Sequence, residues 1–162
     1  MMQAKLDKKT FSALVVKNQE TLFHTAKAIL RSDEDAEDAV QEAICAAFTN
    51  RDSLRDVEKF KSWMLRILTN KCYDICRKRK PTVALEDVAD TLPAASTDPT
   101  ERMTLWQAVL SLGDELRAAV TLFYYDGLSI REISGILGIS EAAVKTRLRR
   151  GRERLRLLLD EK

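Results

Sequence analysis

Apolar residues recur at intervals of three and four along most of this 162-residue chain, which is the spacing of one buried face of an α-helix. One such run contains Phe60, Trp63, Met64, Ile67 and Leu68, and another contains Ile130, Ile133, Ile136 and Leu137. No segment shows the convincing apolar and polar alternation of a half-buried strand. The pattern therefore predicts an all-α fold.

The helical pattern is interrupted once, at residues 81–100. This stretch, PTVALEDVADTLPAASTDPT, contains all three prolines of the chain together with small and acidic residues. Such a composition is typical of a flexible linker. We expect two small helical domains, residues 1–80 and 101–162, joined by a linker at 81–100.

Composition excludes several classes of protein. With 45% hydrophobic and 32% charged residues, the chain is typical of a soluble globular protein. It has no apolar run long enough to span a membrane, and its start, MMQAKLDKKTF, lacks the apolar core of a secretory signal. We expect a cytoplasmic protein without membrane insertion, whose three cysteines are reduced thiols.

The formal net charge of +2 conceals a strong segregation of charge. Residues 33–42 carry six carboxylates and no base, whereas residues 66–80 carry six bases and one acid. A second basic block, residues 141–156, carries seven bases and two acids. Basic blocks are the electrostatic footprint of nucleic-acid binding, although a charge run can also be a merely solvated helix face.

The second basic block belongs to a pattern of two short helices. Ser129 and Glu132 have the spacing of a capping box, and Gly138 suits the left-handed position that ends a helix. Ser140 can cap the next helix, in which Val144, Leu148, Gly151 and Leu155 share one face. The opposite face is polar and basic, with Lys145, Thr146, Arg149, Arg150, Arg152 and Arg156. This pattern predicts a DNA-binding helix-turn-helix; the alternative is a plain helical hairpin with a charged outer face.

The first basic block lies on the helix predicted around Trp63. Off its apolar stripe stand Arg66, Asn70, Tyr73, Asp74 and Arg77. Aromatic groups stack on unpaired bases, amides read base edges and basic groups follow phosphates, so this mixture suits opened or single-stranded DNA. Trp63 can alternatively be a core residue.

Three motifs in order carry a family resemblance. They are DAEDAVQEAICAAF, FKSWMLRILTNKCYDICRKRK and LRAAVTLFYYDGLSIREISGILGISEAAVKTRLRRGRERLR. From Phe11 to Leu159 the chain resembles a bacterial RNA polymerase sigma factor of the extracytoplasmic-function (ECF) class, with the second and fourth sigma regions only. It departs from the family at Leu112-Gly113, where a Leu-Pro pair is common, and in the extra bases of RLRRGRERL.

The resemblance implies a specific role for each block. A sigma factor binds core RNA polymerase, directs it to promoters through the −10 and −35 elements and promotes melting of the DNA. In the −35 step the resemblance implies contacts by Ser140, Lys145, Thr146, Arg147, Arg149, Arg150 and Arg152. In the −10 step it implies contacts by Trp63, Arg66, Asn70, Tyr73, Arg77, Lys78, Arg79 and Lys80, with a base pocket formed partly by residues 49–59.

The resemblance also implies protein partners. The acidic helix would dock on the clamp helices of the largest polymerase subunit through Asp35, Asp38, Gln41 and Glu42. Leu155, Leu157, Leu158 and Leu159 would contact the flap of the second-largest subunit or an antisigma factor, the inhibitor typical of such stress-response regulators. Two alternatives for the acidic run are a metal site and a helix start whose carboxylates satisfy the helix dipole.

No catalytic motif emerges. His24, the single histidine, has no suitably spaced nucleophile, and the chain has no glycine loop of the phosphate-binding kind. Cys72 and Cys76 would share a helix face, but two thiols without further ligands make a weak zinc site or redox switch. We therefore expect a protein that is not an enzyme and needs no cofactor. The alternative function is a helix-turn-helix transcription regulator whose N-terminal domain senses a ligand or dimerises, without binding polymerase.

Overall fold

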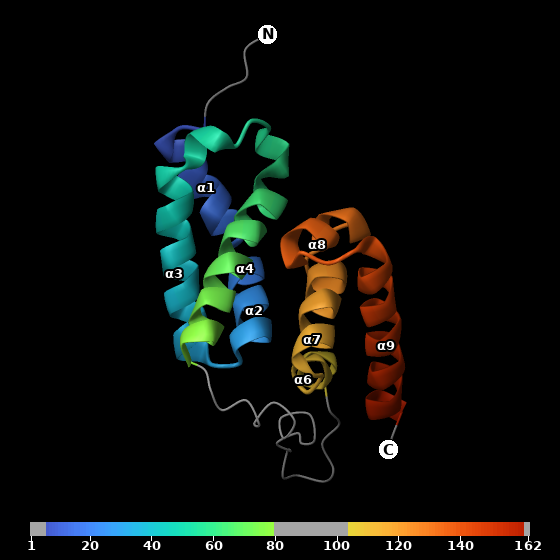
Figure 1. The fold of residues 1–162 in the computed structure, drawn as a ribbon. Helices are drawn as coiled ribbons and strands as arrows, with labels where there is room; N and C mark the ends of the chain where they lie inside the picture. Colours follow the sequence, from blue (N-terminus) through green and yellow to red (C-terminus); the bar gives the residue numbers. More distant parts are fainter. Residues whose placement is uncertain (1–5, 80–103, 161–162) are drawn as a thin grey trace. The chain divides into compact units, whose positions relative to one another are not determined.

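The computed structural model describes residues 6–79 and 104–160, and of Arg79 the backbone only. Every regular element in these two ranges is helical, which confirms the all-α prediction. The chain forms two compact units, Met1–Lys78 and Arg79–Lys162. Figure 1 shows the helices of the first from blue to green and those of the second from yellow to red. The predicted linker, residues 81–100, lies outside the described residues.

The N-terminal unit contains four α-helices and two short 3₁₀ turns. The helices are α1 (Lys8–Lys17), α2 (Gln19–Leu30), α3 (Asp33–Thr49) and α4 (Phe60–Arg79), and the turns η1 (Arg51–Ser53) and η2 (Val57–Lys59) connect α3 to α4. Helices α2 and α3 pack against each other. The buried residues of α3 are all alanines, Ala36, Ala39, Ala43 and Ala47, so the backbones of the two helices can approach closely.

Three aromatic rings tie the remaining helices together. The Phe11 ring of α1 makes T-shaped contacts with Phe48 of α3, at a centroid distance of 5.4 Å, and with Phe60 of α4, at 6.1 Å. The predicted stripe of α4 is buried at Phe60, Met64 and Leu68. Trp63 and Ile67 are half-buried, and Leu65 and Cys72 are buried as well. Helix α4 therefore buries a wider face than the predicted stripe.

The C-terminal unit is built around its last helix. It contains α6 (Leu105–Leu110), α7 (Asp114–Val120), a π-helical turn η3 (Thr121–Tyr125), α8 (Ile130–Leu137) and α9 (Glu141–Asp160). Helix α9 packs against α6, α7 and α8. Its inner face is small or apolar at Val144, Leu148 and Gly151, which are buried as the pattern predicted, whereas Leu155 on the same face is half-buried.

Candidate nucleic-acid interface

The turn between α8 and α9 has the geometry predicted from its caps. The Ser129 Oγ accepts a hydrogen bond from the Glu132 amide at 3.0 Å, and the Glu132 Oε1 accepts one from the Ser129 amide at 2.9 Å. Gly138 ends α8 with φ 71°, a left-handed conformation that favours glycine. The Ser140 Oγ then accepts from the Ala143 amide at 3.0 Å and begins α9. The helix-turn-helix backbone is thus fixed by three local hydrogen bonds between side chains and backbone amides and by one glycine.

Helix α9 lies unusually close to α7. A Cβ placed on Gly151 would lie 2.5 Å from the Cγ2 of Val120, the last residue of α7. Real Cβ atoms essentially never approach another carbon so closely, so the two helices meet at a distance that only glycine permits. This contact sets how far the outer face of α9 projects from the unit.

The outer face of α9 carries the predicted DNA-binding residues. Lys145, Arg149 and Arg150 are exposed, and Thr146 is half-buried beside them. The Arg149 guanidinium lies 3.7 Å from the Glu153 carboxylate, and both side chains are more than half exposed. An exposed pair of this kind is worth about 0–1 kcal/mol, so a phosphate can compete for the arginine. The face is therefore free to bind an anionic partner.

Two other predicted arginines contact their own unit. The Arg147 guanidinium lies 3.8 Å from the Glu115 carboxylate at the start of α7. Arg152 is exposed, and its Nη1 donates a hydrogen bond of 3.2 Å to the Tyr124 hydroxyl in η3. Both contacts orient the arginine toward neighbouring elements of the fold.

A buried arginine, Arg117, stabilises the start of α7, and the sequence analysis did not identify it. Arg117 is fully buried; its Nη1 donates to the Leu112 carbonyl at 2.6 Å and its Nη2 to the Asp114 carboxylate at 2.5 Å. Because a buried charge is costly without partners, these bonds fix the start of α7. In the segment ELRAAV a lone arginine resembles an ordinary surface residue, so the sequence carries no signal for this role.

The predicted −10 face lies on α4 of the N-terminal unit. Arg66 and Asn70 are exposed one helical turn apart, and Tyr73 is half-buried near them. Trp63 is half-buried; its ring lies 5.8 Å from the Phe60 ring, and its Nε1 donates to the Ser53 Oγ at 3.4 Å. One part of the indole thus packs on the core and another part is accessible, so the two readings of Trp63 are compatible.

The basic end of α4 is only partly described. Arg77 and Lys78 are exposed, and the Arg77 guanidinium pairs with the Asp74 carboxylate one turn earlier. Arg79 is the last residue of α4, and Lys80 lies outside the described residues. Asp74 is the single acid of this block, so it moderates the positive potential that Arg77 presents to an anion.

The acidic residues of α3 divide into two groups. Asp33, Glu34 and Asp35 form the first turn, where their negative charges interact favourably with the positive end of the helix dipole. The Ser32 Oγ caps the helix by accepting a hydrogen bond from the Asp35 amide. Asp33 also pairs with Lys27 at 2.5 Å. Asp38, Gln41 and Glu42 lie further along and are exposed. The helix dipole therefore explains the start of the run but not this exposed surface.

The cysteines differ sharply in environment. Cys72 is buried, and burial raises the pKa of its thiol to about 12, so it stays protonated and unreactive near neutral pH. Cys76 is half-buried, and Cys45 is exposed on α3. In the described part of the chain, no three His, Cys, Asp or Glu side chains are grouped so as to hold a metal ion. The pair Cys72 and Cys76 thus gives no accessible thiolate pair to bind zinc.

One further finding concerns membranes. Among the helices of residues 6–79 and 104–160, none combines the length and the apolar character that crossing a membrane requires.

Comparisons with known proteins agree with the two-unit division. Two family models match: Sigma-70 region 2 over residues 14–82 and Sigma-70 region 4 over residues 102–155. The ECF RNA polymerase sigma factor SigW of Bacillus subtilis (strain 168) is 36% identical over 166 residues, which covers 93% of this chain and 89% of that protein. The ECF RNA polymerase sigma-E factor of Escherichia coli (strain K12) is 31% identical over 163 residues, covering 91% and 85%.

Solved structures show the same similarity. The sigma factor RpoE, in complex with the anti-sigma factor NepR from Bartonella quintana, matches with a TM-score of 0.73 and 25% identity over 95% of this chain and 99% of that chain. CnrH, in complex with the cytosolic domain of CnrY, matches with a TM-score of 0.64 and 28% identity, covering 95% and 90%.

Proposed function

The chain belongs to the ECF family of RNA polymerase sigma factors, and we propose that it binds core RNA polymerase, directs it to promoters through −10 and −35 elements and promotes melting of the DNA. The observation that carries this proposal is the capped helix-turn-helix, whose second helix presents exposed Lys145, Arg149 and Arg150. A sigma factor of this kind acts in the cytoplasm and does its work by binding, without catalysis of its own.

In the −35 step, the N-terminal half of α9 enters the major groove. Lys145, Thr146, Arg149 and Arg150 contact base edges and nearby phosphates, and Arg147 and Arg152 contact the backbone, with Ser140 at the start of the helix. Arginine can read guanine through two hydrogen bonds, and threonine can contact a thymine methyl group. The exposure of Lys145 and Arg149 on one side of α9 supports this arrangement.

In the −10 step, α4 holds the opened strand. The exposed Arg66 and Asn70 and the accessible part of Trp63 lie on the element that would meet an unpaired base, with Tyr73 beside them. Arg77, Lys78, Arg79 and Lys80 follow the phosphates. Unstacking a base costs a few kcal/mol, and capture on an aromatic or polar surface offsets that cost.

The polymerase contact uses α3. Asp38, Gln41 and Glu42 are exposed, and together with Asp35 they meet basic residues of the clamp helices of the largest subunit. Complementary charge speeds and orients this docking. The C-terminal leucines of α9 contact the flap of the second-largest subunit. An antisigma factor is a further proposed partner, since the similar sigma factor RpoE was solved in complex with the anti-sigma factor NepR.

Holoenzyme assembly tests the polymerase part of the proposal. Mixed with purified core polymerase, the chain should co-elute with it, and Asp38→Lys with Glu42→Lys should abolish co-elution. The control is Glu20→Lys, which makes the same kind of acid-to-lysine change at one exposed position of α2 and should co-elute normally. A chain that binds promoter DNA but never binds core polymerase would instead be a stand-alone helix-turn-helix regulator.

Run-off transcription from a promoter library tests the DNA part. Arg149→Ala should weaken upstream-element recognition, and the slope of log K against log salt should fall by about 0.9 for one lost phosphate contact. Arg154→Ala is the control, because Arg154 is exposed on the same helix but about 140° away from Arg149.

Asn70→Ala should instead impair strand opening, which permanganate reactivity of unpaired thymines measures. Equal loss at both steps from both substitutions would contradict the two-site division.

A further inference from the structure

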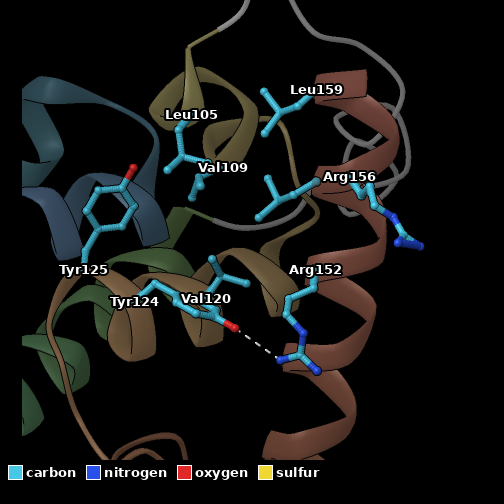
Figure 2. A pocket seen from close by; sticks show the side chains of 9 residues that line it. Leu105, Val109, Val120, Tyr124, Tyr125, Arg152, Arg156 and Leu159 are labelled. Carbon is cyan, nitrogen blue, oxygen red and sulfur yellow. Dashed lines mark hydrogen bonds between the residues drawn. The ribbon is translucent and has the colours of Figure 1, made fainter. Parts of the chain in front are cut away.

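A tyrosine and an arginine from different elements meet on the surface of the C-terminal unit. The Nη1 of Arg152 in α9 donates a hydrogen bond of 3.2 Å to the hydroxyl of Tyr124 in η3, 28 residues earlier. Figure 2 shows this bond beside an apolar pocket of about 330 Å³, in which Leu105 and Val109 of α6 lie across from Leu159 of α9. The promoter contacts proposed above use Arg152 and give Tyr124 no role.

Tyr124 belongs to the π-helical turn η3. In this turn the Asp126 amide donates to the Thr121 carbonyl, five residues back, at 3.0 Å, so the turn holds one residue more than an α-helical turn. Insertions of this kind are frequent at functional sites. The Tyr124 side chain is 49% exposed, and its ring makes a T-shaped contact with the Phe123 ring at a centroid distance of 4.8 Å. The fold therefore presents this aromatic side chain to solvent in a fixed position.

Arg152 differs from two other predicted DNA-binding arginines of α9 in the charge of its partner. The Arg147 guanidinium lies near the Glu115 carboxylate, and that of Arg149 near the Glu153 carboxylate. Arg152 is exposed and, within residues 6–79 and 104–160, forms no ion pair; its partner is an uncharged hydroxyl. A guanidinium has five N–H donors, and this bond uses one of them. The other donors of Arg152 are available to an anion.

The two side chains together can bind a single anion. The Tyr124 oxygen accepts from Arg152, and a phenol hydroxyl is donor and acceptor at once, so its own O–H can still donate to a ligand. Polarisation by the neighbouring guanidinium makes that O–H a stronger donor. A ligand that fits the pair carries negative charge and has acceptor atoms for an O–H and an N–H side by side. A phosphate group has this chemistry, and tyrosine and arginine both contact phosphates in DNA complexes.

The pair also lies where a DNA backbone would pass. At 100° per residue, Arg152 is about 60° from Arg149 and about 20° from Lys145, so the three share one side of α9. Along the axis it is about 16 Å from Glu141, the first residue of the helix, whereas the major groove is about 8.5 Å deep. With the N-terminal half of α9 in the groove, Arg152 and Tyr124 would stand at its rim, beside the phosphates.

We propose that Tyr124 and Arg152 form a binding site for one backbone phosphate at the edge of the −35 element. Arg152 supplies the charge, and Tyr124 holds the guanidinium and donates its O–H to the same phosphate. The inference rests on the proposed promoter binding and deepens it, because it adds a residue from outside α9 to the DNA contact. A phosphate contact carries no sequence information, so this site would fix the position of α9 on every promoter alike.

Neutralisation of single phosphates tests the site. Holoenzyme assembled from the full chain is bound to promoter duplexes in which one phosphate at a time, around the −35 element, is replaced by an uncharged methylphosphonate. Fluorescence anisotropy measures the binding. At one position the replacement should weaken binding of the unsubstituted chain, and at that same position its effect should be smaller for both Arg152→Ala and Tyr124→Phe.

Unmodified DNA separates the charge from the hydroxyl. Arg152→Ala should make the slope of log K against log salt shallower by about 0.9, the value for one phosphate contact. Tyr124→Phe should weaken binding by about 2- to 12-fold, the range for one hydrogen bond, and should leave the slope unchanged because both side chains are uncharged. Tyr125→Phe is the matched control: it removes the same atom from the next residue of η3, whose ring packs on Trp106, and binding should not change.

Each contrary outcome overturns the site. Unchanged binding by Tyr124→Phe, while Arg149→Ala still weakens it, would show that the hydroxyl contacts no phosphate. Different sensitive positions for Arg152→Ala and Tyr124→Phe would show that the two side chains do not share a ligand. Equal losses from Tyr124→Phe and Tyr125→Phe, at every phosphate position alike, would indicate a change in the fold. If the unsubstituted holoenzyme forms but binds no promoter, the proposed function fails, and this site fails with it.

Discussion

The close approach of α9 to α7 predicts the effect of a single added methyl group. In Gly151→Ala the new Cβ would lie 2.5 Å from Val120 Cγ2, whereas two carbon atoms are at optimal separation at about 3.5–4.0 Å. Val120 cannot easily turn away, because it is 1% exposed and its branched side chain has one strongly preferred rotamer in a helix. Relief therefore requires α9 to move outward by about 1 Å.

Two opposing terms set the magnitude. Replacing glycine by alanine inside a helix favours folding by about 1 kcal/mol. Overpacking costs about 1–3 kcal/mol, and the fixed Val120 places this case in the upper half of that range. We expect Gly151→Ala to lower the free energy of unfolding of the C-terminal unit by about 1–2 kcal/mol.

The assay is urea denaturation followed by the fluorescence of Trp106, in a Trp63→Phe background so that only the C-terminal unit is observed. Val120→Ala removes the methyl groups that the new Cβ meets and by itself costs about 2 kcal/mol. In that background, Gly151→Ala should become stabilising, which gives a coupling energy of about 2–3 kcal/mol.

The coupling energy is the decisive quantity. If Gly151→Ala has the same effect in both backgrounds, within about 0.5 kcal/mol, the two positions are not in contact and the close approach is wrong. If Gly151→Ala alone stabilises the unit by about 1 kcal/mol, the helices have room for a methyl group and only helix propensity remains.

Three further predictions concern stability. Thr121→Val should raise the free energy of unfolding of the C-terminal unit by about 1 kcal/mol in urea titrations, because the buried Thr121 hydroxyl makes no hydrogen bond within the described chain. A decrease in the free energy of unfolding would instead show that the hydroxyl has a hydrogen-bond partner. Ser140→Ala should cost about 1 kcal/mol in the same assay and Ser140→Gly only a few tenths, since glycine is tolerated at this position; equal losses would contradict the cap. The pKa of the Cys72 thiol is about 12 in the folded protein and 9.0 in the unfolded chain, so the contribution of this thiol to stability is complete below pH 9 and declines as the pH rises toward 12. Urea midpoints of the N-terminal unit should therefore fall above pH 9, and Cys72→Ala should make that fall smaller.

The features that could be predicted from sequence are those set by near neighbours. Ser129 bonds to Glu132 three residues away, and Gly138 adopts its left-handed conformation because of its own missing side chain. The inner face of α9 follows from helical periodicity alone, and Val144, Leu148 and Gly151 are buried as expected. Local hydrogen bonds and a fixed period need no knowledge of the tertiary structure, so these predictions succeeded.

The features that could not be predicted depend on groups far apart in the chain. The role of Arg117 depends on the position of the Leu112 carbonyl, which accepts its hydrogen bond. The π-helical turn Thr121–Tyr125 lies where the chain passes from α7 toward α8. The pocket needs α6 and α9 to come together, which brings Leu105 near Leu159, 54 positions later. Periodicity placed Gly151 on the inner face but could not show that a methyl group would meet Val120. The DNA-binding and polymerase-binding residues remain predictions for the same reason, since their partners are other molecules.

The length of α9 has a mechanical consequence. It is one uninterrupted helix of 20 residues, about 30 Å long, and Gly151 packs against Val120 near the middle of the helix. Along the helix axis, Leu159 lies about 12 Å beyond Gly151 and Lys145 about 9 Å before it, at 1.5 Å per residue. On the lysine side of Gly151, the buried Val144 and Leu148 oppose an inward movement of that end of the helix.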